Sequence, residues 1–136
     1  MNKTRVLLAD DHPHFAELVE TLLGLAFEVV GKVSNGKALI DAAISLKPDL
    51  ILTDISMPVL NGIEAVDELH RSGCNSKIIM LTVHSDADFV RSCLAVGAAG
   101  YISKPRVATD LQLAIRQVLS GQLFVSPDVV EGNRSS

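Results

Sequence analysis

The stretch that decides the fold is "ILTDISMPVLNG" (residues 51–62). It opens with an apolar run typical of a buried strand, ends that run in one carboxylate, Asp54, and continues into a Met-Pro-x-x-Asn-Gly turn. A lone acid after a strand is usually a turn former or a helix cap. The role of Asp54 therefore depends on which other side chains reach the same edge of the sheet.

Apolar runs of this kind alternate with amphipathic segments along the whole chain. Strands that are apolar on both faces need a layer of helices on each side, so the pattern predicts an α/β fold with a doubly wound, five-stranded parallel sheet. Sheets of this kind place their sites outside the carboxyl ends of the strands. We expect strands over 5–9, 28–33, 50–53, 77–82 and 99–102, and helices over 13–25, 62–72, 86–96 and 107–120, with one more helix marked by Leu39, Ala42, Ala43 and Leu46.

Three acids lie at the ends of these strands. Asp10 and Asp11 follow the first strand and Asp54 follows the third. Carboxylates close together in a cleft repel one another, so one would take up a proton unless a cation were bound there. Oxygen ligands suit Mg²⁺. His12 and His14 adjoin the acid pair and raise the alternative of zinc, but their spacing does not aim both rings at one point.

A hydroxyl and an amine are expected at the same carboxyl ends of the strands. Thr82 ends the fourth strand and Lys104 closely follows the fifth. An ammonium beside a metal site is useful when a second anion joins the cation, and a hydroxyl can bind the same anion. A metal, a lysine and a hydroxyl around Asp54 are the parts of phosphoryl transfer onto that carboxylate. The turn after Asp54 would free the Ser56 backbone carbonyl as a further metal ligand.

Composition excludes several other classes of protein. The chain has 136 residues, 48% of them hydrophobic, which suits one domain with one core. A net charge of −4 without a basic run argues against direct binding to nucleic acid or a membrane surface. The N-terminus does not read as a signal peptide, and no apolar run is long enough to span a membrane. Cys74 and Cys93 lack metal or redox spacing and read as thiols in a reducing cytoplasm.

The motifs resemble those of the receiver domain of bacterial two-component response regulators. The resemblance runs from about Arg5 to Val125 and rests on "LLADDHP", "DLILTDISMPVLNGIEA", "IIMLT" and "GAAGYISKP". The segments "VVGKVSNGKALI" and "AIRQVLSGQLFVSP" look like the NarL/FixJ (LuxR-type) branch. The resemblance implies a flavodoxin-like (CheY-like) sheet with strand order 2-1-3-4-5.

The resemblance also implies a role for each site residue. Asp54 would accept a phosphoryl group from a phosphohistidine on a sensor histidine kinase, and the chain would catalyse only its own phosphorylation and dephosphorylation. Phosphorylation would draw Thr82 inward and turn Tyr101 from a solvent-facing to a buried rotamer, changing the face of the fourth helix, fifth strand and fifth helix. The remaining implied roles are Mg²⁺ binding by Asp10, Asp11, Asp54 and the Ser56 carbonyl, phosphoryl contacts by Thr82 and Lys104, tuning of phosphate lifetime by Ser56 and His84, and a cis peptide between Lys104 and Pro105.

Receivers of this branch usually continue into a helix-turn-helix DNA-binding domain. We expect a receiver over 1–125 and a linker or tail over 126–136, with no output domain in this sequence. The ending "LFVSPDVV" favours a chain cut at the linker over a stand-alone receiver. The expected protein is cytoplasmic, contacts DNA only through the absent domain, and forms a phosphorylation-linked homodimer.

Three alternatives remain open. A haloacid dehalogenase-type phosphatase needs a second Asp two residues after the first, where this chain has Ser56. A flavodoxin needs an aromatic FMN pocket, but aromatic residues are only 4% of the chain and tryptophan is absent. A stand-alone or degenerate receiver would act as a protein-binding module, and the complete set of site residues weighs against it.

Overall fold

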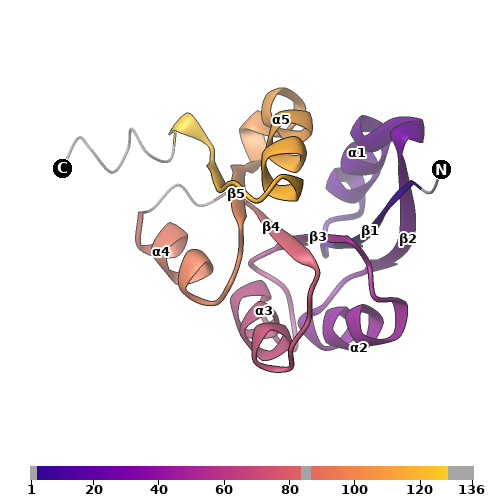
Figure 1. The fold of residues 1–136 in the computed structure, drawn as a ribbon, viewed down its shortest axis with the longest axis vertical. Helices are drawn as coiled ribbons and strands as arrows, with labels where there is room; N and C mark the ends of the chain where they lie inside the picture. The colour runs from indigo at the N-terminus through magenta and orange to yellow at the C-terminus, as the bar shows by residue number, and fades with distance from the viewer. Residues whose placement is uncertain (1–2, 84–86, 129–136) are drawn as a thin grey trace.

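The computed structural model describes residues 3–83 and 87–128. Strands and helices alternate along the chain as expected, and the α/β prediction is confirmed (Figure 1). The strands are β1 (Thr4–Ala9), β2 (Phe27–Val33), β3 (Leu50–Asp54), β4 (Lys77–Thr82), β5 (Gly100–Ser103) and β6 (Phe124–Val125). The helices are α1 (Pro13–Leu23), α2 (Gly36–Leu46), α3 (Gly62–Arg71), α4 (Ala87–Ala95) and α5 (Val107–Leu119), with 3-10 turns at Gly24–Ala26 and Lys104–Arg106.

The strands form one parallel sheet in the order β2-β1-β3-β4-β5-β6. The predicted order 2-1-3-4-5 is therefore confirmed, with one short strand added at the edge. The order reverses between β1 and β3, and a crevice at such a switch point is where open sheets of this kind bind their ligands. The first and third strands, which end in the acids, lie side by side there.

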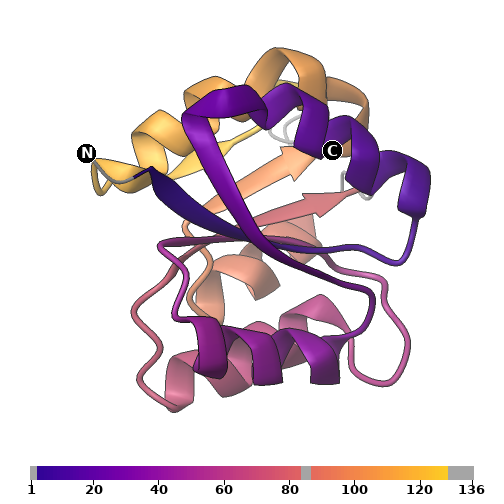
Figure 2. The same ribbon diagram turned by 90° about the vertical axis from the view of Figure 1, so that its right-hand side faces the viewer.

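Two apolar cores hold the sheet between its helices. Successive residues of a strand point to opposite faces, so Leu7 packs in one core and Leu8 in the other. Helices α2, α3 and α4 cover one face, and α1 and α5 cover the other; Figure 2 shows the sheet between these two layers. This double burial accounts for the continuous apolar runs of the central strands. Within the described residues, the structure has no helix with the length and apolar character needed to cross a bilayer.

Most elements match the expected ranges to within one residue, and two local features differ by more. The first helix ends at Leu23 rather than residue 25, because Gly24 takes a φ of 64° that favours glycine and turns the chain toward β2. The sixth strand, absent from the expected five, pairs Phe124 with Gly100 and Val125 with Tyr101. Two residues are too few for an alternating pattern, so only the tertiary contact reveals this strand.

A buried polar network fastens the chain after β6 to α5 and β5. Ser126, the first residue of the expected tail, is fully buried. Its hydroxyl donates to Asp110 Oδ2 at 2.8 Å and accepts from the Ser103 backbone N–H at 3.1 Å. Its own N–H donates to the Tyr101 carbonyl at 3.0 Å. Arg106 also donates two hydrogen bonds to the Asp110 carboxylate.

We expect Ser126→Ala to lower the free energy of unfolding by about 1–3 kcal/mol, because it leaves the buried Ser103 N–H without an acceptor. Urea denaturation measures the change. Ser120→Ala is the control, since its hydroxyl bonds the Gln117 carbonyl at an exposed site. An equal loss in the two variants would contradict the role of the network.

Candidate functional site

The carboxyl ends of four parallel strands carry the site. Asp10 follows β1, Asp54 is the last residue of β3, Thr82 is the last of β4 and Lys104 follows β5. Asp10, Asp54 and Thr82 are buried, and the side chain of Lys104 is only 10% exposed. Because β1 and β3 are paired neighbours, their terminal acids meet at the switch point of the sheet.

Lys104 joins the two buried acids. Its Nζ lies 3.0 Å from Asp10 Oδ2 and donates to Asp54 Oδ2 at 3.3 Å. The ion pair to Asp10 is not aligned as a hydrogen bond, and no other described residue donates to this oxygen. A buried carboxylate oxygen without a hydrogen-bond donor is unusual, because such groups are costly to leave unsatisfied. It therefore provides a lone pair for a further cation.

The environment of Asp54 disfavours its charged form. Burial raises the pKa of this carboxyl above its ordinary value of 3.8, the neighbouring Asp10 also raises it, and the Lys104 ammonium opposes the shift. A carboxylate that is both buried and crowded by another acid is stabilised by added positive charge, so the cluster favours a bound cation.

We expect Asp54→Asn to stabilise the metal-free chain at pH 7. The raised pKa means that the folded state binds more protons than the unfolded state between pH 3.8 and the folded pKa, so stability falls as pH rises through that window. The amide has no such titration, and the advantage of the variant should shrink as the pH falls toward about 4. Urea denaturation with a chelator checks this, with Asp41→Asn, an exposed acid, as control. An Asp54→Asn variant that is less stable than the unmodified chain at neutral pH would contradict it.

The start of α3 fixes the turn after Asp54. The Gly62 N–H donates to the Ile55 carbonyl at 2.7 Å, and Asn61 and Glu64 form a reciprocal capping box at the start of α3. A Cβ at Gly62 would lie 2.1 Å from the Asp54 carbonyl oxygen. Glycine is thus required for this close approach, which sets the path of residues 55–61 beside the acids.

Two further residues lie at the site: His12, considered from the sequence only as a zinc ligand together with His14, and Phe15, which had no predicted role. His12 Nδ1 lies 3.1 Å from Asp10 Oδ1, 3.1 Å from Asp11 Oδ1 and 3.5 Å from Asp54 Oδ2. The Phe15 ring lies with its centroid 4.4 Å from Lys104 Nζ, a cation–π contact. The sequence could indicate that His12 lies near the site, because His12 follows the acid pair directly. It could not indicate this for Phe15, which fits the apolar face of a helix.

The other predicted site residues are placed as follows. Tyr101 is fully buried, so the solvent-facing rotamer expected for the unmodified chain is not the one found. All peptide bonds of the described residues are trans, and the expected cis bond at Lys104–Pro105 is wrong. Pro105 instead lies in the 3-10 turn Lys104–Arg106, whose helical backbone is built from trans peptides. Ser56 is exposed in the turn after Asp54, and His84 lies outside the described residues.

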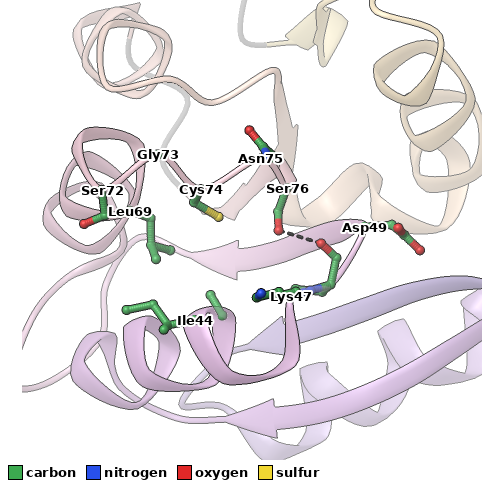
Figure 3. Close-up of a pocket in the computed structure, with 11 residues that line it drawn as sticks. Ile44, Lys47, Asp49, Leu69, Ser72, Gly73, Cys74, Asn75 and Ser76 are labelled. Carbon is green, nitrogen blue, oxygen red and sulfur yellow. Dashed lines mark hydrogen bonds between the residues drawn. The ribbon is translucent and has the colours of Figure 1, made fainter.

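A separate pocket of about 520 Å³ lies at the other end of the strands from the acids (Figure 3). Its lining includes Ile44 and Lys47 near the end of α2, Leu69 of α3, and Cys74 and Ser76 before β4. These residues lie at the amino ends of β3 and β4, and the acids lie at the carboxyl ends. The pocket therefore belongs to a different part of the molecule from the acid cluster.

Comparison with known proteins identifies the family. Residues 6–116 match the response regulator receiver domain. The chain is 38% identical over 123 residues to the nitrate/nitrite response regulator protein NarL of Escherichia coli K12, covering 89% of this chain and 57% of the relative. It is 35% identical over 130 residues to the transcriptional regulatory protein DegU of Brevibacillus brevis, covering 94% of this chain and 55% of the relative.

A solved structure supports the same assignment. The two-component response regulator of the LuxR family from Aurantimonas sp. SI85-9A1 superposes with a TM-score of 0.91 at 26% identity, covering 99% of this chain and all of that one. The chain spans little more than half the length of the curated relatives. With its receiver fold, and with the acids gathered at the switch point, the chain belongs to the response regulator receiver family, in its NarL/FixJ branch.

Proposed function

We propose that this chain is a phosphorylation-dependent signalling switch that accepts a phosphoryl group on Asp54 from a sensor histidine kinase. The observation that carries the proposal is the buried Asp54 carboxylate at the end of β3, with the Lys104 ammonium 3.3 Å from its Oδ2. An Asp54 oxygen would attack phosphorus as the donor's phosphorus–nitrogen bond breaks, and the bonding electron pair would leave with the donor imidazole.

The acid cluster fits Mg²⁺. Asp10, Asp11 and Asp54 offer hard oxygen donors, and the buried Asp10 Oδ2 accepts no hydrogen bond from the described residues. With the Ser56 carbonyl, these residues would hold the ion. When bound, Mg²⁺ supplies positive charge that offsets the negative charge of the transferring group. The chain's own carboxylates would hold that charge beside Asp54.

Lys104 and Thr82 would bind the phosphoryl oxygens. Lys104 already lies between Asp10 and Asp54, so a small movement of its ammonium can follow the oxygens of a phosphoryl group on Asp54. The Thr82 hydroxyl, at the end of the neighbouring strand, would donate to one of them. Phe15 packs its ring against the ammonium, in a cation–π contact that favours this position of Lys104.

The output would be a change in the face formed by α4, β5 and α5. A phosphoryl group on Asp54 adds about −1.5 to −2 charge, and its contacts with Thr82 and Lys104 differ between the two states of that face. Tyr101, which is buried in this structure, would take part in this change together with Thr82. Residues Ser56 and His84 would tune the lifetime of the phosphoryl group.

The partners would be a sensor kinase, a second copy of the chain after phosphorylation, and DNA through a C-terminal domain. DegU of Brevibacillus brevis is a transcriptional regulatory protein. The relatives extend well beyond the length matched here, which leaves room for such a domain. A receiver acting only as a protein-binding module is the second candidate, and the complete acid, hydroxyl and lysine set weighs against it.

Incubation with acetyl phosphate and Mg²⁺ tests the proposal against this second candidate. We expect the intact mass to rise by a single phosphoryl group that is lost on base treatment, and we expect a chelator to prevent the uptake. Beryllofluoride should bind under the same conditions. A chain that takes up neither group in Mg²⁺ would instead be a binding module.

A further inference from the structure

The acid cluster contains a nitrogen donor as well as oxygens. Donor atoms of Asp10, Asp11, His12 and Asp54 all lie within 4.8 Å of one another. The His12 ring reaches the cluster from the residue before α1, where its side chain makes no helix-capping hydrogen bond. His14, two positions later, is exposed and is not part of the group.

The spacing around His12 Nδ1 is that of ligands on one metal ion. Two ligand atoms that each lie about 2.0–2.2 Å from one metal ion are about 2.9–3.5 Å apart when the donor–metal–donor angle is between the octahedral and the tetrahedral value. His12 Nδ1 lies 3.1 Å from one oxygen of Asp10 and 3.1 Å from one of Asp11, and 3.5 Å from Asp54 Oδ2. All four donor atoms lie within 4.8 Å of one another, slightly more than the about 4.2 Å that separates two opposite ligands bound at about 2.1 Å, so the group would contract to hold one ion.

An imidazole ligand changes which metals the site prefers. Mg²⁺ binds oxygen donors and takes imidazole poorly, whereas zinc and other divalent first-row transition metals bind imidazole well. We propose that His12 Nδ1 is a direct ligand in the acid cluster and makes this site bind divalent transition metals, such as Zn²⁺, more tightly than Mg²⁺. The inference rests on the metal site of the proposed function, and Mg²⁺ remains an occupant wherever it is more abundant.

The buried acids also favour positive charge in the cluster. The buried Asp10 Oδ2 lies 3.0 Å from the Lys104 ammonium and accepts no aligned hydrogen bond from the residues that the structure describes, and the His12 backbone N–H donates to Asp10 Oδ1 at 2.8 Å. The competing arrangement has a proton on Nδ1, donated to Asp10 or Asp11. In that arrangement the ring contributes nothing to metal affinity, and the two cases are separable by measurement.

The test compares Zn²⁺ and Mg²⁺ binding in the whole chain by calorimetry. We expect the unmodified chain to bind Zn²⁺ more tightly than Mg²⁺. His12→Gln should weaken Zn²⁺ binding by at least about tenfold, since even the outer partners of metal ligands are worth that much, and should change Mg²⁺ affinity by less than about threefold. His14→Gln is the matched control and should leave both affinities unchanged.

A spectroscopic readout reports the ligand atom itself. Addition of Zn²⁺ should shift the ¹⁵N resonance of His12 Nδ1, and not that of His14, in histidine-labelled protein. Unchanged Zn²⁺ affinity in His12→Gln, or a His12 Nδ1 resonance that does not respond, would overturn the inference while Mg²⁺ binding and phosphorylation stand. A chain that binds neither metal and takes no phosphoryl group would overturn the proposed function itself. His12→Asn serves as a second variant, and urea denaturation confirms that each variant is folded.

Discussion

Asp54→Asn is expected to abolish phosphoryl uptake from acetyl phosphate. The amide is close in size to the carboxylate but carries no negative charge and is a poor nucleophile, so the attack on phosphorus is lost. Asp54 is the acid at the end of β3, and Lys104 donates to it from the next-but-one strand. Base-labile phosphate incorporation, measured by intact mass, should fall below detection.

Asp41→Asn provides the matched control for this substitution. Asp41 is exposed on α2, where it pairs with Lys37 at the surface. Its loss should leave both folding and phosphoryl uptake nearly unchanged, because exposed ion pairs contribute little. If Asp54→Asn were labelled to the same extent as the control, another residue would be the acceptor.

Gly62→Ala is expected to cause the largest loss of stability. Alanine is normally favoured over glycine in a helix by about 1 kcal/mol, so propensity alone predicts stabilisation. Here the added Cβ would lie 2.1 Å from the Asp54 carbonyl oxygen and 3.0 Å from the Ile55 Cα. Both atoms are backbone and cannot rotate away, so α3 or the turn has to move. We expect a loss of about 3 kcal/mol in urea denaturation.

The same displacement should reduce phosphoryl uptake, because it moves the turn that carries the Ser56 carbonyl. Gly31→Ala is the control, since its Cβ would meet only the terminal methyl groups of Leu46 and Leu7 at 3.1 Å. Those side chains can adjust, and we expect a cost of about 1 kcal/mol with uptake retained. A Gly62 variant as stable as the Gly31 variant would show that the turn can move freely.

Long-range sequence patterns were enough to predict the architecture. The central strands are apolar on both faces, and this pattern extends over enough residues to indicate a parallel sheet between two helical layers. The position of the candidate site could be predicted as well, because all strands of a parallel sheet have their carboxyl ends on the same side. Asp10 and Asp54 could therefore be placed together from the sequence, and the structure does bring them together around Lys104.

Features that depend on one contact could not be predicted in the same way. The pairing of Phe124 with Gly100 and the burial of Ser126 beside Asp110 join segments that have no periodic signal. The peptide bond before Pro105 is trans within the 3-10 turn Lys104–Arg106, whereas the resemblance implied a cis bond.

The sequence by itself determined the layers, the strand ends and the identities of the acids, because these depend on patterns repeated over many residues. The tertiary structure alone decided where individual side chains point. It buried Tyr101, brought the ring of Phe15 over Lys104 and turned His12 into the acid cluster. A rotamer is selected by neighbours from distant parts of the chain, and those neighbours are known only once the strands have been assembled.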